Sequence, residues 1–401
     1  MVDARIGIIG FGLRSSLWRY AHNPGNGSRV VAVCDTDERG RADAAEKIGD
    51  GVRVTAGIDE LLTMDLDAVM VLTPDHLHAE HAVRTLEAGV PTFLEKPMAI
   101  TVESADLILE TAYRTGTRLY IGHNMRHMPV IRAMRDAVLA GRIGEVKAVW
   151  CRHFVSTGGD FYFKDWHADR TKSTGLLLQK GAHDIDVIHW LAGGYTTTVS
   201  AVGALSVYGD ITDRRDNSDR RMWDWYDKEN WPPTAQREMA PQVDVEDISM
   251  ANLVLDNGVL ASYQQCHFTP DYWRNYTIIG TEGRLENFGD DDAATVKLWN
   301  KRSDSYQGEA DEIIEVPPAE GGHGGADPLL ISEFVRFALR GGPTMTSPVA
   351  ARQSVAAGVA GTRSIRGGGG AVPVPPLPPE IEAYFHGDQV RKPVEAEPTV
   401  S

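Results

Sequence analysis

The amino-acid sequence predicts an α/β protein with an N-terminal, doubly wound parallel sheet and a second, α+β domain built on a large, mostly antiparallel open sheet. Over the first 125 residues, short apolar runs alternate regularly with helix-like segments. After about residue 128, longer strand-like runs follow one another with few helices between them. The chain has 401 residues, and this length favours two domains over one.

The first half is expected to contain six strands separated by five helices. The strands are predicted at 5–9, 29–34, 52–55, 68–72, 92–95 and 118–122, and the helices at 13–22, 38–48, 58–64, 76–88 and 102–115. This alternation is typical of a parallel sheet with helices on both faces, which binds ligands at the carboxyl ends of its strands. Two of these ends carry polar motifs, Thr73-Pro74 and Glu95-Lys96-Pro97.

A glycine-rich turn follows the first strand, with the order Gly10-Phe11-Gly12-Leu13-Arg14-Ser15. Gly10 permits a tight turn, and Gly12 lets the backbone approach a pyrophosphate at the start of a helix. The second strand ends at Asp35, where an acid would bind the adenosine ribose. Because Asp37 and Glu38 disfavour a 2′-phosphate and Arg39 alone opposes them, we expect NAD rather than NADP. A glycine-rich turn without a nucleotide is the alternative.

The second half is expected to form one large sheet. A helix at 130–140 leads into a strand at 145–155, and further strands are predicted at 198–208, 247–255, 260–267, 275–280 and 296–299. A glycine run and a proline-rich stretch then predict an extended arm that lies over its own or a neighbouring subunit. We therefore expect an NAD-binding Rossmann domain over 1–125, an α+β substrate and oligomerisation domain over 126–370, and the extended arm over 371–401.

Several motifs occur in the order seen in the Gfo/Idh/MocA oxidoreductases, and the chain resembles that family over nearly its whole length. The motifs are Gly10-Phe11-Gly12, Asp35, Thr73-Pro74 with His78, Glu95-Lys96-Pro97, the segments 141–145 and 181–186, and the loop 323–327. The resemblance implies a nicotinamide-dependent enzyme that acts on sugars, cyclitols or their derivatives. We assign to its cofactor pocket Gly10, Phe11, Gly12, Leu13, Arg14, Asp35, Thr73, Pro74, His78, Glu95 and Lys96.

Lys96 and His183 are the expected acid–base groups. Oxidation of a secondary alcohol moves a hydride to nicotinamide and a proton to a base. Lys96 follows a strand end where nicotinamide would lie, and a surface salt bridge to Glu95 is the alternative role. His183 and Asp186 are three residues apart on a helix, so the carboxylate is expected to orient a histidine that titrates near neutrality. A buried histidine without a chemical role would show the same pattern.

The chain departs from the commoner family pattern four residues before His183. That position is often aspartate in similar proteins, but here it is Gln179, followed by Lys180. A neutral amide cannot accept a proton. A Lys-x-x-His pair at 180 and 183 would instead suit an oxyanion or a carbonyl, with Tyr162 or His167 as further proton carriers.

Other polar residues are assigned to the substrate by their place in the chain. Arg126 follows the last strand of the first half, where it would bind substrate or form a salt bridge between the domains. Trp166 and His167 are expected to wall the sugar site, and His323 to reach the substrate from a glycine-rich loop. No metal site is expected, because histidines 76 and 78 cannot face the same way on a helix.

The segment 217–242 combines aromatic rings with charges. Trp223, Trp225, Tyr226 and Trp231 lie in it. Aromatic faces pack well against sugar C–H groups, which suggests a lid over the active site. Rings that anchor a subunit interface are the equal alternative.

Composition limits the partners. A formal net charge of −16 argues against nucleic acid and anionic membranes. The three cysteines are too few and too far apart for a disulfide framework. With neither a signal-like N-terminus nor a long apolar run, the protein is expected in the cytoplasm. The open antiparallel sheet predicts a homodimer or homotetramer.

These observations predict an NAD-dependent oxidoreductase that acts on a secondary hydroxyl of a sugar, glycoside or cyclitol. A redox-neutral, NAD-dependent glycosidase is the nearest alternative, since similar proteins include enzymes that oxidise a sugar, eliminate the aglycone and return the hydride. A nucleotide-binding sensor without turnover is the alternative from another class.

Overall fold

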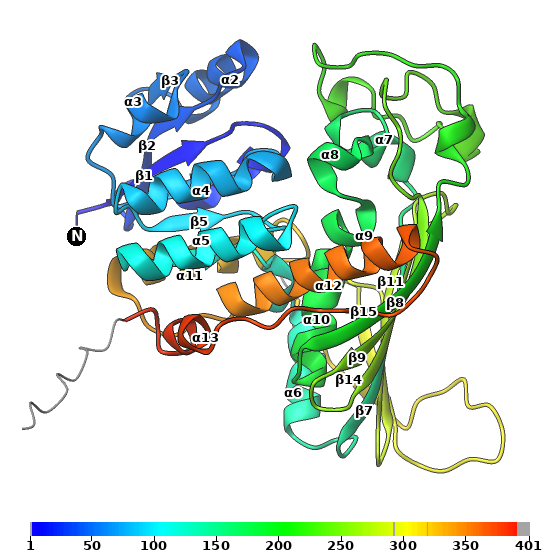
Figure 1. Ribbon diagram of the computed structural model, residues 1–401. Helices are drawn as coiled ribbons and strands as arrows, with labels where there is room; N and C mark the ends of the chain where they lie inside the picture. The colour runs from blue at the N-terminus through cyan, green and yellow to red at the C-terminus, as the bar shows by residue number, and fades with distance from the viewer. Residues whose placement is uncertain (1, 292, 319, 391–401) are drawn as a thin grey trace, which may run out of the picture.

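The computed structural model describes residues 2–291, 293–318 and 320–390. It contains two sheets side by side, one of six strands and one of nine (Figure 1). This arrangement confirms the predicted fold class, a doubly wound parallel sheet followed by a large open sheet. None of the helices in these ranges is long and apolar enough to cross a membrane.

The first sheet has the strand order β3-β2-β1-β4-β5-β6, and all its neighbouring pairs are parallel. Its strands are β1 (Ala4–Ile9), β2 (Ser28–Cys34), β3 (Arg53–Thr55), β4 (Ala68–Val71), β5 (Thr92–Leu94) and β6 (Leu119–Ile121). The helices between them are α1 (Trp18–Ala21), α2 (Glu38–Ile48), α3 (Ile58–Leu62), α4 (His78–Glu87) and α5 (Val102–Thr115). The apolar β1, β4 and β5 are buried on both faces, as expected for a sheet covered by helices.

The predicted helix at 13–22 begins as a 3-10 helix over Leu13–Leu17 and becomes α-helical only in α1. The backbone N–H and the hydroxyl of Ser15 both donate to the carbonyl oxygen of Gly12, at 3.2 and 2.6 Å. This i→i+3 pattern tightens the first turn after the glycines.

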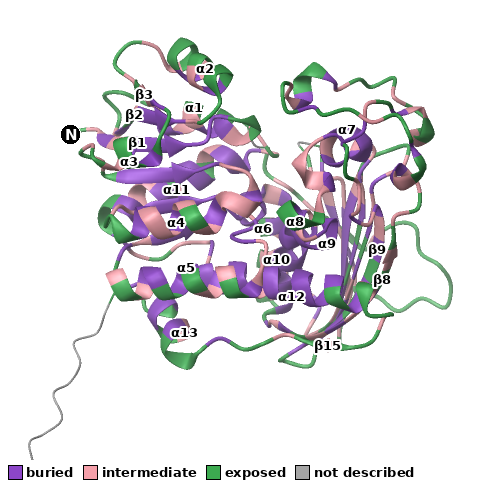
Figure 2. Ribbon diagram, turned by 45° about the horizontal axis from the view of Figure 1, so that its top comes forward, coloured by how far each residue is buried: buried purple, intermediate pink, exposed green. Residues whose placement is uncertain are grey.

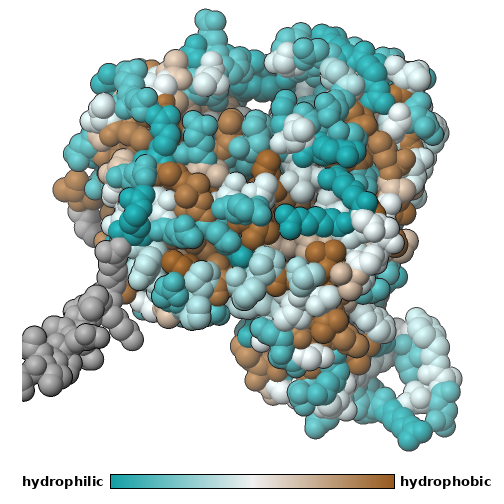
Figure 3. All heavy atoms as spheres, in the orientation of Figure 1, coloured by the Kyte–Doolittle hydropathy of each residue, from teal (hydrophilic) through white to brown (hydrophobic). Residues whose placement is uncertain are grey.

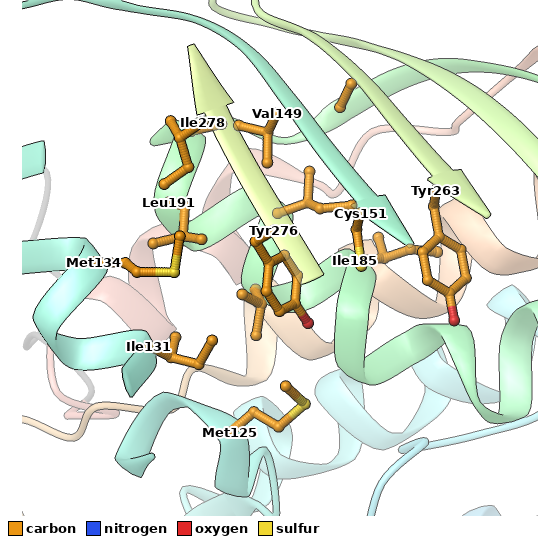
Figure 4. Close-up of a cluster of buried hydrophobic side chains, with 14 of the residues drawn as sticks. Met125, Ile131, Met134, Val149, Cys151, Ile185, Leu191, Tyr263, Tyr276 and Ile278 are labelled. Carbon is orange, nitrogen blue, oxygen red and sulfur yellow. The ribbon is translucent and has the colours of Figure 1, made fainter. Parts of the chain in front are cut away.

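The second sheet has the order β14-β13-β12-β11-β7-β10-β9-β8-β15 and is antiparallel except for the pair β10–β7. Its strands are β7 (Val146–Phe154), β8 (Thr196–Ala204), β9 (Ile248–Leu255), β10 (Leu260–Cys266), β11 (Trp273–Gly280), β12 (Arg284–Phe288), β13 (Thr295–Trp299), β14 (Glu312–Ile314) and β15 (Val372–Pro373). One face packs against helices α6 (Pro129–Leu139) and α10 (Gly181–Ala192). In this core the hydroxyls of Tyr263 and Tyr276 point toward the same side of the close-up (Figure 4).

Helices from the end of the chain complete the first half. Leu330, Phe334 and Phe337 of α11 (Ala326–Arg340) pack with buried side chains of β1, β5 and β6. Helix α12 (Pro348–Arg366) lies between the two sheets and is buried along most of its length (Figure 2). Helix α12 therefore contributes buried side chains to the apolar clusters of both halves.

The extended arm predicted over 371–401 is in part wrong. Residues 372–373 pair with β8, but Pro379–His386 form helix α13. The helix forms because Ile381, Tyr384 and Phe385 bury their side chains against the first half. Residues 391–401 lie outside the described ranges.

Candidate active site

Lys96 stands where the two halves meet. It follows β5, and the bond to Pro97 is cis. Its Nζ lies 3.5 Å from the carbonyl oxygen of Gln179, the last residue of helix α9 (Leu176–Gln179) in the second half. Lys96 is thus the point where the strand ends of the first sheet reach the helices that cover the second.

Burial lowers the pKa of Lys96, and Arg14 and Arg274 lower it further. Asp75 and Glu95 act in the opposite direction by favouring the ammonium. The alternative of a simple surface salt bridge to Glu95 does not describe this site, because Glu95 is buried and pairs with Arg14 at 2.7 Å. Lys96 is an amine in a low-dielectric, mixed-charge environment, where proton affinity is easily changed.

His78 fixes the segment that carries Lys96. Its Nδ1 lies 2.7 Å from the Pro97 carbonyl oxygen and its Nε2 lies 2.8 Å from that of Thr73. Both ring nitrogens therefore join the ends of β4 and β5. The residue stands at the predicted cofactor pocket but serves it by holding backbone in place.

The glycine turn has the space that a dinucleotide requires. Gly10 has φ +90°, and a Cβ there would lie 2.8 Å from the Thr73 methyl group. No atom lies within 4 Å of a Cβ built on Gly12, so this side of the turn is open. Phe11 is buried and Leu13 is exposed. A pyrophosphate at this turn stays a prediction from the sequence.

Asp35 is held in place beside that turn. Its carboxylate accepts hydrogen bonds from the backbone N–H groups of Phe11 at 2.6 Å and Asp37 at 2.8 Å. A Cβ on Gly40 would lie 2.7 Å from the carboxyl carbon, so α2 approaches this side chain closely. A carboxylate has further lone pairs, and those of Asp35 fit the adenosine ribose hydroxyls.

Arg14 and His323 lie together at the start of α11. Arg14 pairs with Glu95 and with Asp327, the latter at 3.2 Å, and His323 Nδ1 lies 2.9 Å from Asp327. Among the described residues, the hydrogen-bond partners of His323 are Arg14 and Asp327. The predicted substrate residue thus stands beside the predicted cofactor residue, in a cluster that ties the glycine turn to α11.

His183 is buried on the first turn of α10, but Asp186 does not orient it. Asp186 instead accepts two hydrogen bonds of 2.7 Å from Arg126 and lies 3.4 Å from His123. The expected His183–Asp186 pair is therefore wrong, because the guanidinium takes both carboxylate oxygens. Arg126 forms the predicted alternative, a buried salt bridge at the junction of the halves.

The expectation that His183 titrates near neutrality is also wrong. Burial and the neighbouring Lys96, Lys180 and Arg274 hold the pKa of His183 well below its usual range, so the imidazole is neutral. Its Nδ1 is buried without a hydrogen-bond partner among the described residues. A buried polar atom left unpaired is costly unless a ligand or water satisfies it.

Lys180 joins α9 to α10, and its Nζ lies 5.9 Å from the centre of the Tyr162 ring. Burial and the charges of Arg274 and Lys96 lower the pKa of Lys180 to about 7. Gln179 is buried, and its Oε1 has no partner in the described part of the chain. The site thus brings together Lys96, Gln179, Lys180 and His183, as the sequence predicts.

Trp166 and His167 form a wall next to this cluster. Their rings stack with centroids 3.7 Å apart, and the His167 ring packs edge-on to Tyr162. Asp165 holds His167 Nδ1 at 2.6 Å. Asp165 and the two neighbouring rings therefore fix the orientation of the His167 ring.

Sequence reasoning missed the buried centre under His183, which is Asp184. Its carboxylate interacts with His153 at 2.8 Å, Tyr263 at 2.9 Å, Arg274 at 3.1 Å and the Tyr276 hydroxyl. These charges and hydrogen bonds hold the pKa of Asp184 well below its usual range. In the sequence, Asp184 stood out only as part of the motif 181–186. Nothing in the sequence predicted that Arg274 pairs with it, because Arg274 lies ninety residues farther along the chain, in β11.

The segment 217–242, here named the bridging segment, contacts the first half next to Asp35. Arg221 pairs with Asp37 at 3.0 Å and with Asp43 at 2.9 Å, and Arg39 pairs with Asp224 at 2.6 Å. In Figure 3 polar residues of the two halves meet at the top of the view. These contacts favour the predicted lid, although Trp223 and Trp231 remain largely exposed.

Comparison with known proteins agrees with this architecture. Residues 4–123 match the Gfo/Idh/MocA oxidoreductase family's NAD-binding Rossmann fold, and residues 135–374 match its C-terminal alpha/beta domain. A levoglucosan dehydrogenase solved with NADH superposes with a TM-score of 0.74 at 19% identity, covering 94% of this chain and all of that one.

The curated relatives are named as enzymes of several kinds. 1,5-Anhydro-D-fructose reductase of Ensifer adhaerens is 28% identical over 284 residues, covering 70% of this chain and 74% of that protein. Inositol 2-dehydrogenase of Rhizobium meliloti is 30% identical, covering 54% and 63%. 2,7-Anhydro-N-acetylneuraminate hydratase of Mediterraneibacter gnavus is 30% identical, covering 51% and 57%. Since the two family models together span most of the chain, the protein belongs to the Gfo/Idh/MocA oxidoreductases and has NAD as its cofactor.

Proposed function

We propose that the protein is an NAD-dependent dehydrogenase that acts on a secondary hydroxyl of a sugar, glycoside or cyclitol, with Lys96 and His183 as its acid–base residues. The observation that carries this proposal is the cluster at the carboxyl end of the parallel sheet. There a buried amine, a second buried lysine and a neutral histidine with an unpaired Nδ1 come together beside the nucleotide turn.

The relatives support the substrate class. By their names, an anhydrofructose reductase, an inositol dehydrogenase and a levoglucosan dehydrogenase act on sugars or a cyclitol. The walls formed by Trp166 and Tyr162 offer aromatic faces of the kind that pack against sugar C–H groups.

Each residue of the cluster has its own role in the proposed reaction. Bound NAD supplies the hydride acceptor at its nicotinamide ring. Lys96 Nζ takes the proton of the reacting hydroxyl, because burial has made the neutral amine accessible. The Lys180 ammonium donates a hydrogen bond to the oxygen on which negative charge develops. Neutral His183 is the second acid–base group, because its unpaired Nδ1 can exchange a proton with the bound substrate.

A redox-neutral reaction is the second candidate. Gln179 and Lys180 replace the acidic pattern that is common in similar proteins, and one relative is named as a hydratase. In this version the same groups would remove a proton next to a transient carbonyl, and the hydride would return to the product.

One assay separates the candidates. The protein is incubated with NAD and a panel of free sugars, cyclitols and aryl glycosides, while NADH absorbance and free aglycone are recorded together. NADH that accumulates with substrate and is lost in Lys96→Ala supports the dehydrogenase, whereas aglycone without net NADH supports the glycosidase. Lys47→Ala removes an exposed lysine of the same half as a control. NAD binding without either product on a broad panel would contradict both and favour the sensor.

A further inference from the structure

Asp75 is a buried carboxylate without an assigned role, and it follows the end of β4 beside the end of β5 that carries Lys96. It begins the short 3-10 helix over Asp75–Leu77 that follows β4, and it is 5% exposed. Its Oδ2 has no hydrogen-bond partner among the described residues. A buried acid without such a partner is expensive and points to a function.

Among the charged groups that oppose the burial of the Asp75 carboxylate, His78 acts most strongly and Lys96 next. The groups that lower the pKa of Asp75 are His78, Lys96, His167 and the Gln179 side chain. The Asp75 charge in turn raises the pKa of Tyr162. His78 is held by two carbonyl oxygens and His167 by Asp165. Burial raises the pKa of Asp75, and these neighbours oppose that rise.

Two carboxylates, Asp75 and Glu95, favour the charged form of Lys96, and the charge of Glu95 is balanced by an ion pair with Arg14. Arg14 binds it at 2.7 Å, whereas none of the ion pairs in the described ranges contains Asp75. Gln179 lies near Lys96, because its backbone oxygen is 3.5 Å from Lys96 Nζ, and its side chain lowers the pKa of Asp75. Lys96 and Asp75 thus share one neighbour and carry opposite charges.

We propose that Asp75 is a positioning residue for Lys96 and supplies, from the end of β4, the negative charge that position 179 lacks in this chain. When Lys96 Nζ takes the hydroxyl proton it becomes an ammonium, and the Asp75 carboxylate stabilises that charge without taking the proton itself. Gln179 keeps the carboxylate in place. This inference rests on the proposed function only for its effect on turnover.

The first test measures Lys96 directly and needs no substrate. The rate at which Lys96 reacts with an acylating reagent is followed from pH 5 to 11 by peptide mass spectrometry. Asp75→Asn should shift the titration of Lys96 about one pH unit lower, because an opposite charge at this range favours the ammonium. Asp65→Asn, which removes an exposed carboxylate of the same half, should leave it unchanged. An unchanged titration in Asp75→Asn would overturn the proposal.

The second test moves the negative charge from position 75 to position 179. Asp75→Asn combined with Gln179→Glu exchanges amide and carboxylate at nearly constant shape. Asp75→Asn alone should lower kcat at least tenfold with a smaller change in KM, and the double variant should recover most of that loss and the Lys96 titration. A loss that the double variant does not recover, or one that follows a fall in Tm, assigns Asp75 a structural role only. If wild type turns over nothing on the panel, the proposed function fails while the labelling result still decides the role of Asp75.

Discussion

Lys180 carries a charge that changes within the physiological pH range. Its pKa is lowered to about 7 by burial and by Arg274 and Lys96. If its ammonium assists the reacting oxygen, kcat/KM should fall as pH rises through about 7, because the assisting cation becomes a neutral amine. Lys180→Arg keeps a permanent cation, so the fall near pH 7 should disappear from its pH profile. Lys180→Met should lower kcat/KM on the acid side as well. A wild-type limb near pH 7 that survives in Lys180→Arg would contradict this role.

For single residues, the sequence predicted which side chains lie in the site better than it predicted which side chains they bind. Lys96, Gln179, Lys180 and His183 meet as expected, because each follows a strand end or begins a helix whose position the sequence indicates. The partner of His183 was not predictable, since a three-residue helical spacing places Asp186 within reach but does not exclude Arg126 from another element. The sequence alone assigned no role to Asp75, because the role proposed here depends on Gln179, about a hundred residues farther along the chain.

The bridging segment is the element that connects the second half to the nucleotide-binding end of the first. Its three ion pairs with α2 and the preceding loop are partly exposed, so each contributes modestly. Arg221→Ala removes two of them and should raise the Kd for NAD about three- to tenfold, mainly through faster dissociation in stopped-flow fluorescence.

Arg215→Ala is the matched control for this prediction. Arg215 pairs with Asp219 and Glu238, both of the same half, so its loss should leave NAD dissociation unchanged. The difference between the two variants should shrink as salt is raised, because exposed pairs are screened. Equal dissociation rates for both variants at low salt would show that the segment does not retain the cofactor.

Elements with a strong apolar periodicity were predicted with bounds close to those observed. Short edge strands and a helix without a clear apolar face were not predicted. Helices α2 and α5 have the predicted bounds, because apolar spacing and a capping residue coincide in both. Strands β14 and β15 are two or three residues long at the sheet edges, too short for a pattern. Helix α12 is rich in alanine and buried on several sides, so it shows no clear apolar face.

The whole molecule contains histidines that folding keeps neutral. Burial lowers the pKa of His153 to about 3 and those of His127 and His189 to about 4. An unfolded histidine titrates at about 6.5, so below that pH the unfolded chain binds more protons than the folded one. Each such group therefore lowers the free energy of unfolding as pH falls from 6.5 toward 4. His189→Gln should reduce this slope by about 1.4 kcal/mol per pH unit in urea unfolding.

The outer face of the second sheet carries exposed apolar side chains in opposite pairs. Val202 lies across from Met250, and Val254 across from Leu260. Such a face on an open sheet supports the predicted self-association. Sedimentation velocity should give a dimer or tetramer that Leu260→Glu weakens. Leu139→Glu, at an exposed position of helix α6, should not change the distribution. A wild-type monomer at micromolar concentration would contradict the prediction.

The packing of α11 on the first sheet also has a consequence for how the protein is made. Strand β6 ends at residue 121, but the helix that covers one face of its sheet begins only at residue 326. A ribosome therefore releases most of the chain before that face can close, and Ile6, Phe93 and Tyr120 stay open to other molecules meanwhile. The part of this protein that is synthesised first is the part whose folding is completed last.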